Sequence, residues 1–165
     1  MSAAEAFLEQ GVIVRAEGRS PASRFEFSAT PGDALDGQPL VVLVDGGSAS
    51  GSEIVAGALR DHGRATLLGE RTFGKGSVQT VIPLRDGQAL KLTTSRYYTP
   101  AGVSIHERGL EPDITIGPTE GDPARHTPVA PMKDAAVLTA LQYLKDRGLG
   151  THYAAVKTTS AAQKR

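Results

Sequence analysis

Residues 39 to 68 read PLVVLVDGGSASGSEIVAGALRDHGRATLL, and this stretch decides the fold. Its first six residues, 39 to 44, are apolar and rich in valine, which predicts a strand buried on both faces, as parallel strands of α/β sheets are. An amphipathic helix that ends near His62 and Gly63 is predicted next, because apolar residues recur there at helical spacing. These residues are Ile54, Val55, Ala58 and Leu59. With a second apolar strand at 65 to 68, the order predicts one βαβ unit with a right-handed crossover.

An antiparallel hairpin is expected after this unit. Residues 78 to 83 and 89 to 98 have the composition of extended segments, and Asp86-Gly87 between them is a dipeptide typical of tight turns. Parallel and antiparallel strands are therefore expected in one chain. The predicted fold class is α/β, in the mixed α+β sense, with a mixed sheet and packed helices.

The segments on either side of this centre are less regular. Residues 3 to 10 predict a short helix with Gly11 as its C-cap. A strand at 12 to 14 and a surface loop over 17 to 37, with one weak strand at 25 to 27, are expected next.

The last third of the chain is expected to contain one helix between two irregular segments. Residues 118 to 132 are rich in Pro, Gly and Thr and predict a linker. A helix over 133 to 148 is expected to pack on the core through its apolar side, and the tail at 149 to 165 is expected to be disordered. The apolar side comprises Ala136, Leu138, Leu141 and Leu144.

Composition limits the classes of function. The 165 residues are 39% hydrophobic, which is enough for one globular domain, and 18 basic residues balance 18 acidic ones, so no net charge favours nucleic acid or an anionic membrane. The lack of cysteine excludes disulfides, thiolate metal sites and cysteine catalysis. No stretch is apolar enough for a membrane span, and the amino terminus has no pattern of an export signal.

Ser50 is the first candidate for a chemical role. It lies between the predicted buried strand and the predicted helix, where free N–H groups and the positive end of the helix dipole meet a reacting oxygen. The alternative is structural, because Ser50 and Glu53 form the pattern S-x-x-E of a capping box. On these residues alone both readings stay open.

A serine nucleophile needs a base, and no histidine is well placed. His62 lies about 18 Å along the helix from Ser50, and His106, His126 and His152 have no metal-ligand spacing or paired acid. Lysine can replace histidine when burial or a positive neighbourhood keeps it neutral. Lys75, between Gly74 and Gly76, is the candidate, although an isolated lysine between glycines is usually a loop residue.

A nucleotide site is a weaker interpretation of the same lysine. Gly69 to Lys75 fits G-x-x-x-x-G-K, but position 76 is Gly where the phosphate-binding loop requires Ser or Thr, and no suitable helix follows. The pattern G-x-S-x-G around a nucleophilic serine is also missing, because Ser48 and Ser52 stand on either side of Ser50.

Residues 39 to 115 resemble the catalytic core of the C-terminal processing (tail-specific) serine peptidases. The resemblance is carried by LVVLVDGGSASGSEIVAGALRDHGRATLLGERTFGKGSVQTVIPL and LKLTTSRYYTPAGVSIHERGLEPDI, and it extends weakly back to AEAFLEQGVIVRAEGR. Several motifs align at fixed spacing, which neither a capping box nor a stray GKG would produce. The resemblance implies a crotonase-like peptidase core, partial over residues 1 to 117 and truncated at its amino terminus.

The resemblance also implies an active site. Ser50 would attack the scissile carbonyl to form an acyl-enzyme, Lys75 would act as its base, and Gln79 would orient Lys75. Glu53 belongs to the same motif, and the backbone N–H of Gly51 would supply one oxyanion donor. Asp61 matches an acidic position of the family's helix and is expected to be structural. No metal or cofactor is implied.

Geometry adds one check on this assignment. In a regular strand Lys75 and Gln79 would lie about 13 Å apart, too far for a hydrogen bond, so a bend is expected near Gly74 to Ser77.

The resemblance covers part of the family's architecture. The family's upstream half of the core, with the second oxyanion donor, and its PDZ domain are not in these residues. The leading hypothesis is a serine endopeptidase that cleaves proteins near their carboxy termini. The second is a non-catalytic remnant that binds peptide or a subunit. Full-length relatives are usually periplasmic or otherwise extracytoplasmic, and a homo-oligomer is left open.

Overall fold

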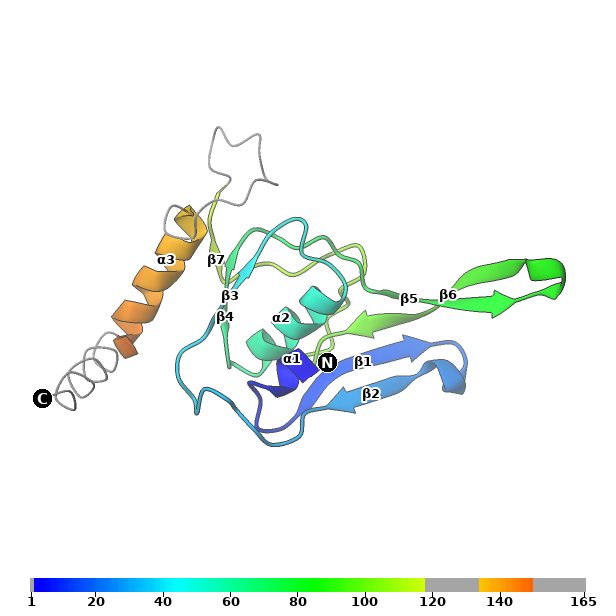
Figure 1. Ribbon diagram of the computed structural model, residues 1–165, viewed down its shortest axis with the longest axis horizontal. Coiled ribbons are helices and arrows are strands. Elements are labelled where there is room, and N and C mark those ends of the chain that lie inside the picture. The colour runs from blue at the N-terminus through cyan, green and yellow to red at the C-terminus, as the bar shows by residue number, and fades with distance from the viewer. Residues whose placement is uncertain (1, 118–133, 150–165) are drawn as a thin grey trace, which may run out of the picture.

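The computed structural model describes residues 2–117 and 134–149. Two sheets and two longer helices make up this part of the chain (Figure 1). The strands are β1 (Val12–Gly18), β2 (Phe25–Ser28), β3 (Val41–Val44), β4 (Thr66–Gly69), β5 (Ser77–Pro83), β6 (Ala89–Tyr98) and β7 (Ile114–Thr115). The helices are α1 (Ser2–Glu5), α2 (Gly51–Asp61) and α3 (Ala135–Leu144), with short helical turns at Pro21–Ser23, Arg85–Gly87 and Lys145–Leu149.

The predicted βαβ unit is present. β3 and β4 are parallel neighbours, with Val41 opposite Thr66, and α2 connects them. β7 adds in parallel on the other side of β4, so the sheet order is β3-β4-β7. The expected α/β class is confirmed, but the expected mixed sheet is wrong, because the parallel pairs form this sheet and the antiparallel pairs form a second one.

The burial expected for residues 39 to 44 is wrong for one face of the strand. β3 is an edge strand of the described sheet, and Leu43 is 42% exposed while Val44 is buried. Side chains alternate along a strand, so Leu43 points away from the core cluster that contains Val42 and Val44. The apolar run therefore predicted the strand correctly, but it predicted neither the exposed face of the strand nor its position at the edge of the sheet.

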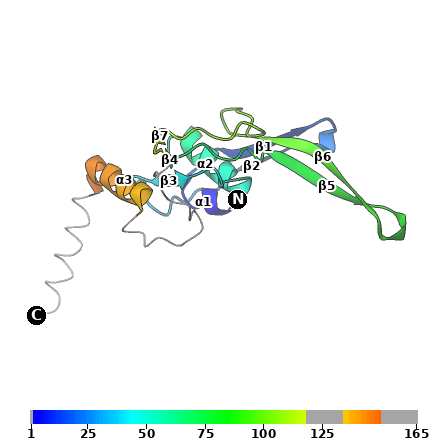
Figure 2. The same cartoon turned by 90° about the horizontal axis from the view of Figure 1, so that it is seen from above.

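The predicted hairpin belongs to an antiparallel sheet with the order β2-β1-β6-β5. β5 and β6 pair from Ser77–Arg96 to Pro83–Ala89, and their tip projects from the body of the molecule (Figures 1 and 2). β1 is longer than the three residues expected, because residues 15 to 18 pair with β6. The weak strand expected at 25 to 27 is β2.

The core lies around α2, which packs against β1 of one sheet and β4 of the other. Its buried members include Ile54, Ala58 and Leu59, the apolar stripe predicted from the sequence. Full burial of a side chain as large as Ile54 or Leu59 stabilises the fold by about 1.5–3 kcal/mol. This packing fixes α2, and with it the residues at the start of the helix.

Two expectations about helices are wrong in detail. α1 ends at Glu5 rather than at Gly11, and Gly11 instead leaves room for the ring of His62, which would lie 2.4 Å from a Cβ there. On α3, Leu138 and Leu141 are 45% and 37% exposed, whereas Ala140 is buried. The small Ala140 allows close approach to β3 and β4, and this turns the leucines outward.

The linker expected at 118 to 132 lies outside the described residues, as do residues 150 to 165 of the expected tail. Within the described part, α3 is joined to the parallel sheet by a hydrogen bond of 2.9 Å between the hydroxyls of Tyr143 and Thr66.

Asp33 ties the loop before β3 to the start of β4. Its carboxylate accepts hydrogen bonds from the Arg64 guanidinium at 2.7 and 3.1 Å and from the backbone N–H groups of Leu35 and Gly37. The hydrogen bond from Arg64 is the main reason that the pKa of Asp33 falls from 3.8 to about 2.

This pKa shift predicts a pH dependence of stability. A carboxyl whose pKa is lower in the folded chain contributes fully above about pH 4 and loses that contribution as the pH falls toward 2. We expect the urea midpoint of the wild-type chain to fall more steeply across this window than that of Asp33→Asn, measured by circular dichroism. Parallel pH profiles of the two proteins would contradict the assignment.

Candidate active site

Ser50 lies at the junction between the loop after β3 and the first turn of α2. Its backbone has φ 54° and ψ −111°, which is an uncommon conformation for a residue with a side chain. The glutamate half of the predicted capping box forms, since the N–H of Ser50 donates to Glu53 Oε2 at 2.8 Å. The Ser50 side chain faces the backbone N–H of Glu53, as in the other half of a capping box.

Glu53 is completely buried, and its carboxylate connects Ser50 to the loop that carries Lys75. Oε2 accepts hydrogen bonds from the N–H groups of Ser50 and Lys75 at 2.8 and 2.9 Å. Oε1 accepts from the Thr72 hydroxyl at 2.5 Å and from the N–H of Gly74 at 2.7 Å. The four acceptor positions of a carboxylate are thus all occupied.

The loop between β4 and β5 brings Lys75 to this place. Gly74 has φ 90°, and a Cβ there would lie 2.9 Å from the N of Gly109. A Cβ at Gly76 would lie 2.5 Å from the N of His106. Both glycines are therefore required for the loop to lie against residues 105 to 110. β5 begins only at Ser77, so Lys75 lies before the regular strand, and the bend expected near Gly74 to Ser77 stays a prediction.

Gln79 lies on β5, beside an irregularity of the hairpin. The register of β5 and β6 shifts between Val78 and Gln79. The side chains of Lys75 and Gln79 are exposed. Within residues 2–117 and 134–149, no hydrogen bond joins the side chains of Ser50, Lys75 and Gln79 to one another. The structure thus brings the main chains of Ser50 and Lys75 together, with Ser50 half-buried and the side chains of Lys75 and Gln79 exposed.

Gly51 is the first residue of α2, so its N–H belongs to the free N–H groups of the first helical turn. Gly51 is exposed, and a Cβ placed on it would meet no atom within 4 Å.

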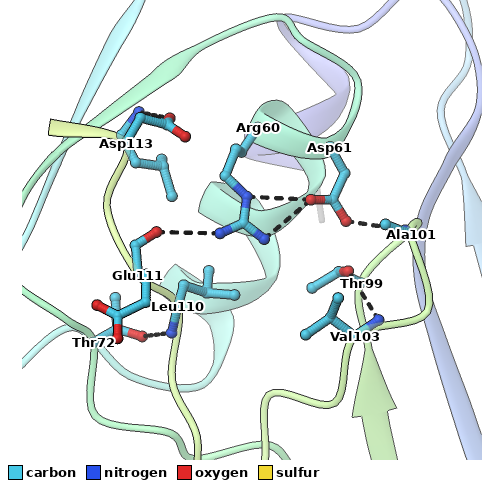
Figure 3. A network of polar contacts seen from close by, with 10 residues as sticks. Arg60, Asp61, Thr72, Thr99, Ala101, Val103, Leu110, Glu111 and Asp113 are labelled. Carbon is cyan, nitrogen blue, oxygen red and sulfur yellow. Dashed lines mark hydrogen bonds and ion pairs between the residues drawn. The ribbon is translucent and has the colours of Figure 1, made fainter.

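Asp61 and His62 have structural contacts. The Asp61 carboxylate accepts hydrogen bonds from Arg60 and from the backbone N–H of Ala101 at 2.9 Å (Figure 3). His62 is the C-cap of α2, and its Nε2 lies 2.7 Å from the carbonyl oxygen of Val12. Asp61 and His62 thus have structural roles at the end of α2 that lies opposite Ser50.

Sequence reasoning missed Thr72 and the segment 105 to 110. Thr72 is 4% exposed, and its hydroxyl accepts a hydrogen bond of 2.7 Å from the N–H of Leu110 (Figure 3). His106, in the same segment, has a buried Nδ1 without a hydrogen-bond partner among the described residues. A threonine between charged residues and a glycine gives no local signal of burial, so only the tertiary contacts reveal it.

Metal ligation and membrane insertion have no counterpart in the described residues. Within 2–117 and 134–149, no group of three or more His, Cys, Asp or Glu side chains is placed to hold a metal ion. None of the helices in this part combines the length and apolar character that a membrane crossing requires.

The sequence matches known proteases over most of the described part. The profile described as "Peptidase family S41" matches residues 1–116. The "Carboxy-terminal-processing protease" of Bartonella bacilliformis is 54% identical over 116 residues, which are 70% of this chain and 27% of that protein. The "C-terminal processing peptidase, chloroplastic" of Tetradesmus obliquus is 52% identical over 88 residues, which are 53% of this chain and 19% of that protein.

The chain also superposes on solved protease structures. The structure titled "Photosystem II D1 C-terminal processing protease" superposes with a TM-score of 0.66 at 42% identity, over 71% of this chain and 30% of that chain. A putative S41 protease from Bacteroides fragilis superposes with a TM-score of 0.67 at 14% identity, over 87% of this chain and 40% of that chain, and shows the shared fold. The chain thus spans less than half the length of the proteins it matches.

Proposed function

This chain belongs to peptidase family S41, and we propose that it carries the nucleophile and the base of a serine peptidase that processes carboxy termini. Ser50 is the nucleophile and Lys75 the base. One observation carries the proposal: a single oxygen of buried Glu53 accepts hydrogen bonds from the backbone N–H groups of both residues and so holds Ser50 and Lys75 close together.

The reaction is an acyl transfer in two steps. Lys75, as a neutral amine, takes the proton of the Ser50 hydroxyl while Ser50 Oγ attacks the scissile carbonyl carbon. The backbone N–H of Gly51 donates to the developing oxyanion, and Lys75 then gives the proton to the leaving amine. In the second step Lys75 takes a proton from a water molecule, the water attacks the ester carbonyl carbon, and Lys75 returns the proton to Ser50 Oγ as the ester bond breaks. Gln79 orients the Lys75 side chain during these transfers.

Lys75 must be shielded from water to act as a neutral amine, yet its side chain is exposed in the described residues. We infer that the bound substrate supplies this shielding. Phe73, two residues before Lys75, is 67% exposed. An apolar side chain of the substrate would pack on this ring and so exclude water from the loop that carries Lys75.

The substrates we propose are proteins, cleaved near their carboxy termini, because the relatives are named for that processing. An extracytoplasmic compartment is part of the same proposal. The second hypothesis, a module that only binds peptide or a subunit, is not favoured by relatives that are named as proteases.

Covalent labelling tests the proposed nucleophile. We expect a fluorophosphonate probe to add one mass increment to the purified chain, and Ser50→Ala to abolish the addition. Lys75→Ala is expected to lower the labelling rate by at least about 100-fold, since loss of a positioned general base typically costs 10² or more.

Ser52→Ala is the matched control, because Ser52 lies on the same helical turn and is exposed. Its labelling rate should equal that of the wild-type chain. A folded wild-type chain that takes up no probe, or one that is still labelled after Ser50→Ala, would overturn the proposal and favour the binding module.

A further inference from the structure

Thr72 occupies a central position between three parts of the chain. Its buried hydroxyl donates to Glu53 Oε1 at 2.5 Å and accepts from the N–H of Leu110 at 2.7 Å. Its backbone N–H donates to the carbonyl oxygen of Leu110 at 3.1 Å. The side-chain hydroxyl and the backbone N–H of Thr72 are thus both hydrogen-bonded, and Thr72 links the segment 105 to 110 to the carboxylate that holds Ser50 and Lys75.

The segment 105 to 110 also contacts the loop between β4 and β5 that carries Lys75, called here the lysine loop. The N–H of Glu107 donates to the carbonyl oxygen of Gly74 at 2.9 Å, and the backbones approach so closely that a Cβ on Gly109 would lie 2.2 Å from the carbonyl oxygen of Thr72. The position of this segment therefore limits where residues 72 to 74 can lie. Figure 3 shows the Thr72–Leu110 contact beside α2.

The consequence for the site follows from the geometry of Glu53. The backbone nitrogens of Ser50 and Lys75 lie within 2.9 Å of one oxygen, so they are separated by no more than twice that distance. Rotation of the carboxylate would change both contacts at once. Thr72 and Gly74 hold the other oxygen and so prevent that rotation.

Ser50 needs such a restraint, because its positive φ costs about 1–3 kcal/mol and persists only where surrounding contacts enforce it. We propose that Thr72 is a positioning residue of the site, acting through Glu53 to hold Ser50 and Lys75 in the relative position that the reaction requires. This inference rests on the proposed function of Ser50. It assigns to the segment 105 to 110 an influence on the nucleophile that acts through Thr72 and Glu53.

Two substitutions separate this role from simple packing. Thr72→Val keeps the shape but removes both the donor and the acceptor, whereas Thr72→Ser keeps both. We expect Thr72→Val to lower the first-order labelling rate at saturating probe by at least about 10-fold, a change equivalent to about 1.4 kcal/mol. The probe concentration for half-maximal rate should change little, and Thr72→Ser should restore the rate to within about threefold of the wild type.

Hydrogen exchange gives a readout that does not depend on labelling. The amides of Gly74 and Lys75, which donate to Glu53, should exchange at least about 10-fold faster in Thr72→Val than in the wild type and in Thr72→Ser. The amide of Val14 in β1, far from Thr72 along the chain and buried in the core, should be unchanged in all three proteins.

The outcomes are distinguishable. Equal labelling rates and equal exchange at Gly74 and Lys75 in Thr72→Val and wild type would overturn the positioning role. Faster exchange at every amide, including Val14, would also overturn it, because the effect would then be global destabilisation. Absence of labelling in the wild-type chain would instead reject the proposed function, and the exchange comparison would still decide whether Thr72 holds the lysine loop.

Discussion

Glu53→Gln is expected to lower the free energy of unfolding by about 3 kcal/mol and to reduce the labelling of Ser50 by at least about 100-fold. The substitution keeps the shape of the side chain but replaces one acceptor oxygen with an NH₂ group, which can only donate. Each oxygen of Glu53 accepts two hydrogen bonds, so either orientation of the amide places donors against donors.

The less costly orientation places the NH₂ group at the position of Oε1. The Thr72 hydroxyl can turn and accept, but the N–H of Gly74 cannot and loses its partner. In the other orientation the N–H groups of Ser50 and Lys75 both lose their acceptor. A buried donor without a partner costs about 1–3 kcal/mol. Loss of the Gly74 contact also frees the side-chain amide to rotate, which changes the relative position of Ser50 and Lys75.

Urea denaturation followed by circular dichroism measures the first effect, and probe uptake by intact mass measures the second. Glu107→Gln is the control, because the Glu107 side chain is 83% exposed, and its unfolding free energy should stay within about 0.5 kcal/mol of the wild type. A Glu53→Gln chain as stable and as readily labelled as Glu107→Gln would contradict the assignment of Glu53 as the connecting group.

Gly109→Ala is the second substitution with a large expected effect, a loss of about 2–5 kcal/mol in the free energy of unfolding. Gly109 has φ 66°, which costs a residue with a side chain about 1–2 kcal/mol. Its Cβ would also lie 2.2 Å from the carbonyl oxygen of Thr72, and relieving such an overlap typically costs a further 1–3 kcal/mol. The backbone of Thr72 cannot move away without breaking its hydrogen bonds to Leu110.

Gly102→Ala separates the two contributions. Gly102 has φ 80°, but a Cβ there meets no atom within 4 Å, so only the backbone cost of about 1–2 kcal/mol is expected. The comparison uses urea midpoints of the three chains. Equal losses for the two alanine variants would show that the close approach of Gly109 to Thr72 contributes nothing to stability.

Local patterns in the sequence were sufficient for the main elements. The apolar run before Asp45 and the helical spacing of Ile54, Ala58 and Leu59 predicted β3, α2 and β4, because strand and helix periodicities depend on neighbouring residues. The hairpin around Asp86-Gly87 followed from turn chemistry for the same reason. Ser50 and Lys75 were candidates from their positions between these elements, and the resemblance supplied their roles.

Burial at edges and faces could not be predicted in this way. Leu43 is exposed because it lies on the face of β3 opposite the core cluster, and Leu138 is exposed because α3 packs through Ala140. Both facts depend on which elements meet. An apolar residue has the same local pattern whether or not another element covers it.

The sequence by itself determined the βαβ unit, the hairpin and the place of Ser50 at the start of a helix, since these depend on contacts between residues close in the chain. Only the tertiary structure decided that the Glu53 carboxylate is buried and that Thr72 joins it to Leu110. Those contacts join residues 19 and 38 positions apart. Polar side chains at such separations carry no periodic signal, because the donors that satisfy them are brought together only by the packing of α2 between the two sheets.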